Sequence, residues 1–467
     1  MQISETARTL AMLAESGTMS WEEIISNEIA EFRSSDKYRI ICDAEQYYKN
    51  RSDVQNKSKD VKNRTNSKIE HPIVRLLVSQ KADYLLSKPF SVTADTNDYT
   101  EALEKLFDNE FRRKIHGFAR DTVKTGISYL IPYFRNGKLL FMAVPAREII
   151  PLWTDSENSE LDGFIRFYDR VEYQGRQKTT VQYAEYWSRN GVQYFRGENG
   201  VYRYDPEHGE GFVPHFTVNG KPYNWAEVPL LWLRYNEEEL PLSYFVKELV
   251  DSYNWQTSVT DDVLRDVAKF VYVLKNYGGT DLAQFVKELR ECLAIEVNSD
   301  GGVDKLQPEI DISGVMSFID KQRRDIFAYA NGVDTKDPEL GNASGTALLF
   351  RYMGLDNDCA ALGAELQSTF QRLKIFADTY FQIISGKDFS QQNFSVVFNT
   401  DMPVNEGDVI TNCRNSAGII SEKTILENHP WVKSAEEEQR RLAEEKQKQT
   451  DELGGNPFEE LMNREQP

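Results

Sequence analysis

The side chains best suited to hold a metal ion are scattered along the sequence. Of the five histidines, only His208 and His215 lie close together, in a loop rich in Gly and Pro with no clear third ligand. Zinc needs three or four ligands, so this pair does not predict a zinc site. Residues 300–304, Asp-Gly-Gly-Val-Asp, lack the alternating oxygen ligands and the terminal glutamate of a calcium loop. We therefore expect no metal site and no cofactor.

Sequence motifs for enzymatic chemistry are also missing. There is no Gly-x-x-x-x-Gly-Lys-Ser/Thr loop to cradle phosphates and no His-Glu-x-x-His helix. Carboxylate pairs are plentiful in so acidic a chain, so none of them is diagnostic of acid–base catalysis. Asp356, Asn357 and Asp358 fall inside an expected helix, and we interpret them as its solvated face. We predict no catalytic residue and do not expect an enzyme.

One stretch of the chain is locally basic. Residues 51–68 contain the cations Arg51, Lys57, Lys59, Lys62, Arg64 and Lys68 against Asp53 and Asp60. Contact with nucleic-acid phosphates is one interpretation of such a stretch, and a solvated connector, which the composition favours, is the other. The whole chain has a net charge of −19, which argues against a protein that coats nucleic acid with a basic surface.

Composition and sequence ends indicate a broad class of protein. Hydrophobic residues make up 40% of the 467 residues, enough for several packed units. The four cysteines lie far apart, which suits a reducing compartment. The first residues lack the basic and apolar regions of a signal peptide, and no run of about 18 apolar residues exists to cross a membrane. We expect a soluble protein, made in the cytoplasm, with no membrane contact.

The chain is organised around a helix–loop–helix at residues 311–384. In its first half, apolar residues recur at three- and four-residue steps, which places them on one helical face. Asn331-Gly332 is expected to end this helix, because glycine reaches the left-handed conformation that a C-terminal cap needs. The second helix begins after Ser344, a good N-cap residue, and continues for roughly 60 Å. A helix of this length is typical of a strut in an assembly.

The remaining pattern mixes helices and strands and predicts an α+β fold. Helical spacing covers most of the first 125 residues, with a capping box at Ser20 and Glu23. From Gly126 the period changes to two, and turns such as Asn136-Gly137 predict one meandering antiparallel sheet of about 120 residues. The other expected elements are a long helix ending near residue 268, strands at 270–274, 293–297, 303–306 and 394–398, and helices at 281–291 and 420–449.

Several short stretches carry a family resemblance. They are Asn66-Ser67-Lys68-Ile69, Lys81-Ala82-Asp83-Tyr84-Leu85-Leu86-Ser87-Lys88-Pro89, Gly126-Ile127-Ser128-Tyr129-Leu130, Leu249-Val250-Asp251-Ser252-Tyr253-Asn254, Gly341-Asn342-Ala343-Ser344-Gly345-Thr346-Ala347-Leu348 and Ile419-Ile420-Ser421-Glu422-Lys423-Thr424. In this order, over about residues 21–446, they resemble the portal protein family of tailed bacteriophages, in its siphophage branch. One departure is Ser87, where the family pattern has glycine before Lys-Pro.

The resemblance implies a portal-type architecture with long stem helices, an antiparallel β-rich wing, a small α/β clip and a helical crown. By position, the parts would be the wing at 1–240, the stem helices at 241–269 and 311–332, the clip at 270–310, the channel loop at 333–343, a long wing-to-crown helix at 344–388, a strand returning to the wing at 389–416, and crown helices with a disordered tail at 417–467.

The resemblance also implies an assembly and its partners. Twelve subunits would form a ring at one vertex of the capsid, and double-stranded DNA would pass through its channel during packaging and ejection. The clip would meet the terminase large subunit, which hydrolyses ATP, and later the head–tail adaptor. Major capsid and scaffolding proteins are further expected partners, with assembly in the host cytoplasm and a final place in the virion.

Candidate site residues follow from these assignments. Lys336, the lone cation of the channel loop, would make weak contacts with DNA, and Gly332 and Gly341 would be the hinges of the loop. We expect the channel wall to be mainly electronegative, because the net charge is −19 in every copy.

Two cations of the second stem helix are possible exceptions to this electronegative wall. Lys321 and Arg324 could form basic rings in the stem, although pairing with Asp320 or Asp325 explains them equally well. Two other functions stay open. One is a structural capsid or tail protein without DNA contact, and the other, less favoured, is a DNA-processing enzyme such as a nuclease.

Overall fold

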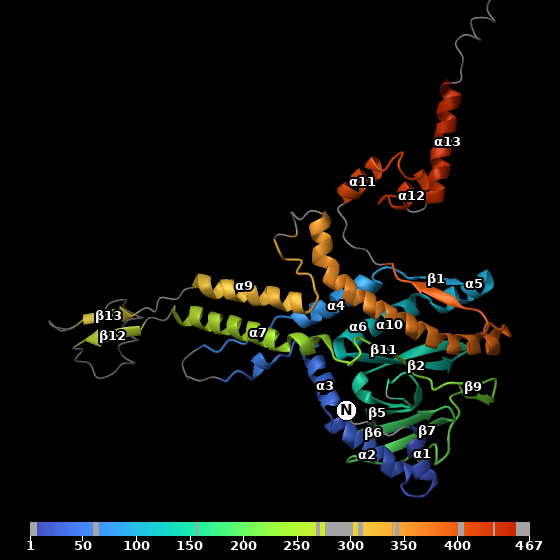
Figure 1. Ribbon diagram of the computed structural model, residues 1–467. Coiled ribbons are helices and arrows are strands. Elements are labelled where there is room, and N and C mark those ends of the chain that lie inside the picture. Colours follow the sequence, from blue (N-terminus) through green and yellow to red (C-terminus); the bar gives the residue numbers. More distant parts are fainter. Residues whose placement is uncertain are drawn as a thin grey trace, which may run out of the picture. The chain divides into compact units, whose positions relative to one another are not determined.

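The computed structural model describes residues 7–58, 65–155, 157–267, 271–275, 302–306, 312–338, 340, 345–399, 406–432 and 435–453. The chain divides into two units, a larger one of residues 1–333 and 355–400 and a smaller one of residues 334–354 and 401–467. Their helices and antiparallel sheets confirm the α+β class (Figure 1).

Helices dominate the start of the larger unit, as expected. They are α1 (Ala7–Glu15), α2 (Trp21–Ser34), α3 (Asp36–Tyr48), the 3-10 helix η1 (Asp53–Asn56), α4 (Ile73–Leu86), α5 (Asn97–Leu106) and α6 (Asn109–Thr125). The predicted capping box is present: the Glu23 N–H donates to Ser20 Oγ (3.2 Å), and the Ser20 N–H donates to Glu23 Oε2 (2.9 Å). The short strand β1 (Ser91–Ala94), between α4 and α5, was not predicted.

The described strands between residues 127 and 234 form three separate sheets, so the prediction of one meandering sheet is wrong. The sheets have the orders β11-β2-β3, β4-β5-β6-β7-β8 and β10-β9. The strands are β2 (Ile127–Arg135), β3 (Lys138–Val144), β4 (Ile149–Trp153), β5 (Leu161–Gln174), β6 (Gln177–Ser188), β7 (Gly191–Glu198), β8 (Val201–Tyr204), β9 (Phe216–Val218), β10 (Lys221–Tyr223) and β11 (Leu231–Arg234).

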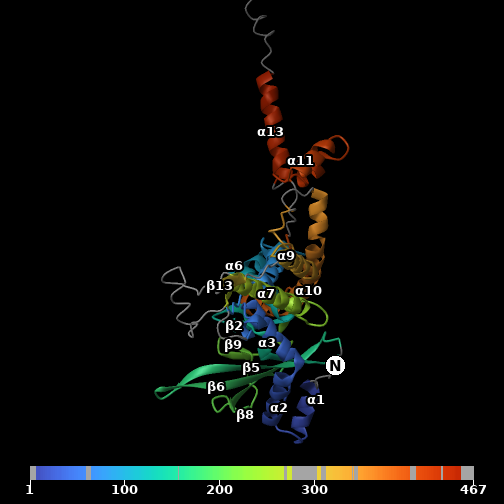
Figure 2. The same cartoon turned by 90° about the vertical axis from the view of Figure 1, so that its left-hand side faces the viewer.

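The break between the two larger sheets has a local cause. After β3, Pro145 leads into the 3-10 helix η2 (Ala146–Glu148) instead of a hairpin turn, and β4 then starts the second sheet. Strand β11 closes the first sheet by pairing with β2, with Leu231 opposite Leu130. The long β5–β6 hairpin extends from the second sheet (Figure 2).

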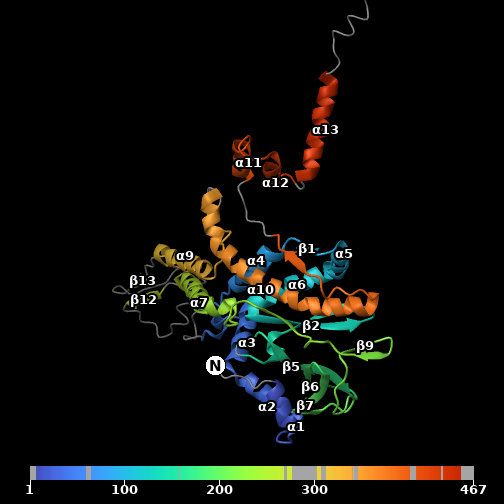
Figure 3. The ribbon, with the colours of Figure 1, turned by 45° about the vertical axis from the view of Figure 1, so that its right-hand side comes forward.

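These sheets and helices stack in four layers. Alternate residues of β2 face opposite cores, as the two-residue period of a strand requires. Leu130 joins the core shared with α4, α6 and α10, whereas Tyr129 joins the core between the two sheets. In β4, Ile149 faces that middle core and Ile150 faces the core shared with α1 and α2. The order is therefore helices, three-stranded sheet, five-stranded sheet, helices (Figure 3).

Two long helices, α7 (Leu242–Val267) and α9 (Ile312–Tyr329), lie side by side in the larger unit (Figure 1). Gln322 Nε2 donates to Ser252 Oγ across the pair (2.5 Å). Between the two helices in sequence, β12 (Val271–Lys275) and β13 (Gly302–Leu306) form an antiparallel pair. The expected helix at 281–291 and strand at 293–297 lie outside the described residues.

The long second helix is confirmed as α10 (Gly345–Ser385), of 41 residues. After it, β14 (Phe394–Val397) pairs with β1. The smaller unit adds α11 (Glu406–Asn415), α12 (Glu422–Glu427) and α13 (Ala435–Leu453). One helix was expected at 420–449, but the chain divides there around Pro430, which has no N–H for a helical hydrogen bond.

Candidate functional site

Helix α9 ends in a hydrogen-bonded cap just before the expected channel loop. The Gly332 N–H donates to Phe327 O (2.8 Å) and the Asn331 N–H donates to Ala328 O (3.2 Å), the two bonds of a Schellman motif. Asn331 is in the left-handed region, with φ of 50°. The helix stop is therefore confirmed, but asparagine and not glycine supplies the left-handed residue, which asparagine also tolerates.

Gly332 has a packing role at this cap. A Cβ atom at Gly332 would lie 2.3 Å from Leu77 Cδ2 and 3.2 Å from Gln80 Oε1, so a larger residue here would require the Leu77 side chain to move. Its role as a hinge stays a prediction. The same holds for Gly341, which lies outside the described residues.

Lys336 lies in a tight turn of the smaller unit and is exposed to solvent. The Asp337 N–H donates to Asp334 O (3.0 Å), and the Lys336 N–H donates to Asp334 Oδ1 (3.0 Å). Asp337 also pairs with Arg351 of α10 at 2.7 Å, which the sequence did not suggest. Within the described part of the chain, the Lys336 ammonium has no carboxylate partner. It is therefore available for a phosphate, as the prediction requires.

Lys321 and Arg324 are both exposed on α9, but their surroundings differ. Lys321 Nζ lies 2.8 Å from Asp325 Oδ2, and this hydrogen bond raises the pKa of Lys321. Among the described residues, Arg324 Nε makes only a long hydrogen bond, 3.5 Å, to the backbone oxygen of Asp320. The pairing interpretation thus applies to Lys321, and Arg324 keeps the freer guanidinium.

The α7–α9 pair leaves large apolar side chains uncovered. On α9, Ile319 and Ile326 are buried, but Met316 and Phe318 are 46% and 48% exposed. The other large apolar side chains exposed on the two helices are Tyr244, Phe245, Trp255, Leu264, Ile312 and Tyr329. Single exposed apolar residues are common, whereas contiguous apolar surface is typical of sites where another protein binds.

The basic stretch at 51–68 is only in part a solvated connector where the structure describes it: Arg51 and Lys68 are exposed, but Lys57 and Ser67 contact α7. Lys57 forms an ion pair with Asp262 of α7, and its side chain is only 9% exposed. The Ser67 N–H donates to Asp262 Oδ1 (2.6 Å), and Ser67 Oγ donates to Asp261 Oδ2 (2.5 Å). Burial opposes the ionisation of Asp262, but these hydrogen bonds lower its pKa. Residues 59–64 lie outside the described part.

The interpretation of Asp356 and Asp358 as a solvated face is also wrong. Asp358 forms an ion pair with Lys81 of α4, which is 1% exposed, and accepts a hydrogen bond from the Tyr235 hydroxyl (2.7 Å). Asp356 accepts one from the Tyr84 hydroxyl (2.9 Å). The sequence contains one sign of this pairing, because Lys81 falls among the apolar positions of an amphipathic helix. A charge that is buried there needs an acidic partner from elsewhere in the chain.

The histidines give no support to a metal site. Burial lowers the pKa of His215 to about 4, and its Nδ1 accepts a hydrogen bond from the Trp225 N–H (3.1 Å). His208 pairs instead with Asp205, at 2.9 Å. Over the described residues, no group of three or more His, Cys, Asp or Glu side chains could hold a metal ion. None of the described helices combines the length and apolar character needed to cross a membrane.

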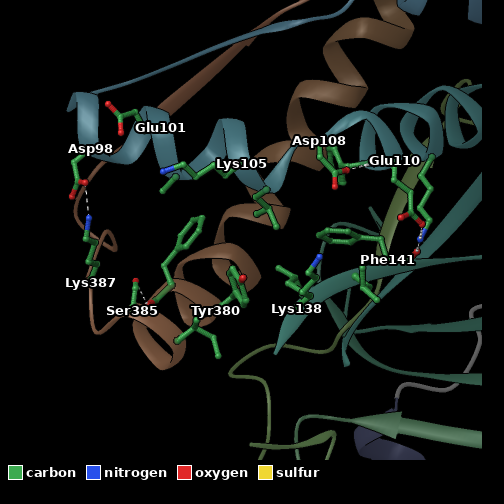
Figure 4. Close-up of a pocket in the computed structure, with 18 residues that line it drawn as sticks. Asp98, Glu101, Lys105, Asp108, Glu110, Lys138, Phe141, Tyr380, Ser385 and Lys387 are labelled. Atoms are coloured by element: carbon green, nitrogen blue, oxygen red, sulfur yellow. Dashed lines mark hydrogen bonds and ion pairs between the residues drawn. The ribbon is translucent and has the colours of Figure 1, made fainter. Parts of the chain in front are cut away.

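A cavity of about 320 Å³ lies in the larger unit between α5, α6, β3 and the end of α10 (Figure 4). Phe111, Phe141 and Phe381 are among its apolar lining. Charged residues at its rim form ion pairs with one another: Lys387 lies 2.6 Å from Asp98, and Lys114 lies 3.5 Å from Glu110. None of the candidate DNA-contact residues lines it.

Comparison with known proteins shows the family of the chain. Residues 34–452 match the family model described as phage portal protein, SPP1 Gp6-like. The chain is similar to the portal protein of Bacillus phage SPP1, with 29% identity over 399 residues that cover 84% of this chain and 78% of that protein. It is also similar to the portal protein of Clostridium phage phiCD119, with 28% identity over 432 residues, 87% of this chain and 92% of that protein. The chain therefore belongs to the family of SPP1 Gp6-like phage portal proteins.

Proposed function

We propose that twelve copies of this chain form a ring at one capsid vertex, and that DNA is packaged and ejected through the central channel of the ring. Membership of the portal family over most of the chain supports a structural component of the phage capsid. In this proposal α7 and α9 are the stem, residues 270–310 are the clip and residues 333–343 are the channel loop. The ring holds no motor, so ATP hydrolysis belongs to the terminase large subunit.

The observation that carries the proposal is the uncovered apolar surface of the α7–α9 pair. A fully buried side chain such as Met or Phe stabilises by about 1.5–3 kcal/mol relative to its exposed state. Met316 and Phe318 are both about half exposed in the single chain, at 46% and 48%. Neighbouring copies that cover these residues recover this energy at every interface. A closed ring repeats the same interface without leaving an end uncovered.

The clip supports docking of partners. Its described strands, β12 and β13, pair only with each other, so each has an unpaired edge within the described residues. Such edges are stabilised when another chain adds a strand or covers them. We assign this region to contacts with neighbouring clips, with the terminase large subunit during packaging and with the head–tail adaptor afterwards. Major capsid and scaffolding proteins are further partners in this proposal.

Electron microscopy of the purified protein tests the ring directly. End-on views should show a closed ring of twelve subunits with an open centre. Met316→Glu should prevent the ring, because a carboxylate would be buried at each interface. Val201→Glu is the control, since Val201 is 57% exposed on β8 and lies outside the stem. A wild-type protein without rings, or Met316→Glu rings equal to those of the control, would contradict the proposal.

A further inference from the structure

The base of the channel loop is held by three residues on one face of α4. Leu77, Gln80 and Lys81 are spaced three and four residues apart, so their side chains project from the same side of the helix. Leu77 packs against Gly332, where a Cβ atom would lie only 2.3 Å from Leu77 Cδ2. Gln80 bonds to the backbone of Val333, which follows this glycine, and Lys81 bonds to the backbone of Asn331, which precedes it.

Gln80 binds Val333 as a neighbouring strand would. Its Nε2 donates to Val333 O (2.8 Å) and its Oε1 accepts from the Val333 N–H (2.9 Å). Val333 is itself 5% exposed, so both polar groups of its backbone are satisfied away from solvent. This double contact fixes the last residue before Asp334, where the exposed turn of the loop begins.

Lys81 adds a link between the two helices that flank the loop. Its Nζ donates to Asn331 O, directly after α9, at 3.2 Å, and forms an ion pair with Asp358 of α10. The Tyr235 hydroxyl donates to the same Asp358 oxygen at 2.7 Å and so orients the carboxylate. A buried ammonium needs such partners, because an uncompensated buried charge is strongly destabilising.

We propose that Gln80 and Lys81 are positioning residues that pin the base of the channel loop, so that loop movement begins at Asp334 and not at Gly332. The proposal rests on the proposed function for the part that makes residues 333–343 a channel loop. Lys81 joins α4, the backbone that follows α9 and Asp358 of α10, so that a displacement of the loop base at Asn331 is resisted by the same ammonium.

An ordinary core ion pair is the competing explanation, and the chain offers a matched control for it. Lys57 and Asp262 form a comparably buried pair, with side chains 9% and 14% exposed. Lys57 contacts Ser67 O and the Trp255 ring and, within the described part of the chain, forms no hydrogen bond or ion pair with residues 331–333. Replacing this pair should therefore lower stability without acting on the loop base.

Hydrogen exchange of the purified full-length chain, followed by mass spectrometry, tests the pin. Gln80→Leu removes both bonds to Val333 without leaving a buried charge, and Lys81→Met with Asp358→Asn removes the ion pair as a unit. Both should speed exchange of the amides at 331–333 roughly tenfold, the size expected for loss of one or two hydrogen bonds. Lys57→Met with Asp262→Asn should leave these amides unchanged.

Unchanged exchange at 331–333 in both variants, or an equal rise in the Lys57 control, would overturn the proposal. A second measurement is the DNA packaged per particle, which Gln80→Leu should change although rings still form. Packaging equal to wild type with faster exchange would overturn the positioning role. Failure of the wild-type chain to form rings would instead overturn the proposed function. The exchange result would still decide whether Gln80 and Lys81 hold residues 331–333.

Discussion

At the scale of single residues, the three candidate cations are not equivalent. The Lys321 ammonium lies 2.8 Å from the Asp325 carboxylate. Lys336 is exposed, and its hydrogen bond to the Asp334 side chain is made by its backbone N–H, not by its ammonium. An exposed ion pair is weak, so Asp325 reduces the attraction of Lys321 for phosphate without abolishing it. Lys336 is therefore the stronger candidate for a DNA contact, with Arg324 next.

Lys336→Glu should leave ring assembly normal and reduce the DNA packaged per particle. The lysine becomes a circle of charges in a ring, and the glutamate would replace weak attraction of phosphates by repulsion. Ring counts by electron microscopy and DNA content per particle measure the two effects separately. Lys138→Glu, on an exposed residue at the start of β3, is the charge-matched control. Normal packaging by Lys336→Glu would exclude this role.

Gly126 illustrates a residue fixed by backbone geometry. It ends α6 with φ of 85°, and a Cβ atom there would lie 2.0 Å from Glu239 O. Gly126→Ala should destabilise the protein by roughly 3 kcal/mol, because it adds backbone strain and overpacking. Gly137→Ala is the control: φ is 73°, but nothing lies within 4 Å of the added atom, so only about 1 kcal/mol of strain is expected. Urea unfolding measures both, and equal shifts would contradict the steric argument.

At the scale of elements, the sequence predicts what short-range chemistry decides. The β2–β3 turn has φ of 52° at Asn136 and 73° at Gly137, the pattern that an Asn-Gly hairpin requires. The same holds for the Ser20 capping box and for the length of α10. Partners far apart in sequence were missed: β11 returns to β2 across about a hundred residues, and Lys81 finds Asp358. Local sequence patterns do not indicate which residues far apart in the chain will pair.

The candidate site divides in the same way. Its loop, its lone lysine and its helix stop follow from local patterns, whereas the residues that hold its base come from α4, some 250 positions earlier in the chain. The stretch that contains Lys81 is one of those that carry the family resemblance. In the structure this stretch packs against α10: Lys81 and Tyr84 bond to its carboxylates, and Leu85 shares its hydrophobic core.

The clip is the element whose role can be tested by removal. Deletion of residues 276–304 should abolish ring formation or docking of the terminase motor, because it removes most of β13 and leaves β12 without a partner. A second deletion, of 276–301 with a short Gly-rich turn in its place, retains the β12–β13 pair and separates the strand pair from the rest of the clip. A ring that packages DNA after the larger deletion would show that the assignment is wrong.

At the scale of the whole molecule, net charge affects how tightly the proposed ring would bind DNA. The chain has 74 acidic against 55 basic residues, and in the proposed ring this excess would be repeated in each of the twelve copies. Several basic residues are used internally, as Lys57 and Lys81 are in buried ion pairs. Each DNA phosphate that a protein neutralises requires a cation at its surface. A channel with few free cations would let DNA slide, because no position along the duplex is held tightly.

We therefore expect purified rings to bind double-stranded DNA weakly at physiological salt, with a shallow dependence on salt concentration. The logarithm of affinity falls with the logarithm of salt in proportion to the number of phosphates contacted, so the slope counts the cations that touch DNA. Lys336→Glu should make the slope shallower still, and Arg324→Glu should do so if the stem forms a basic ring. The measurement is a titration at several salt concentrations, with Lys138→Glu rings as the control. Tight binding with a steep slope, as from six or more phosphate contacts per duplex, would contradict a mainly electronegative channel wall.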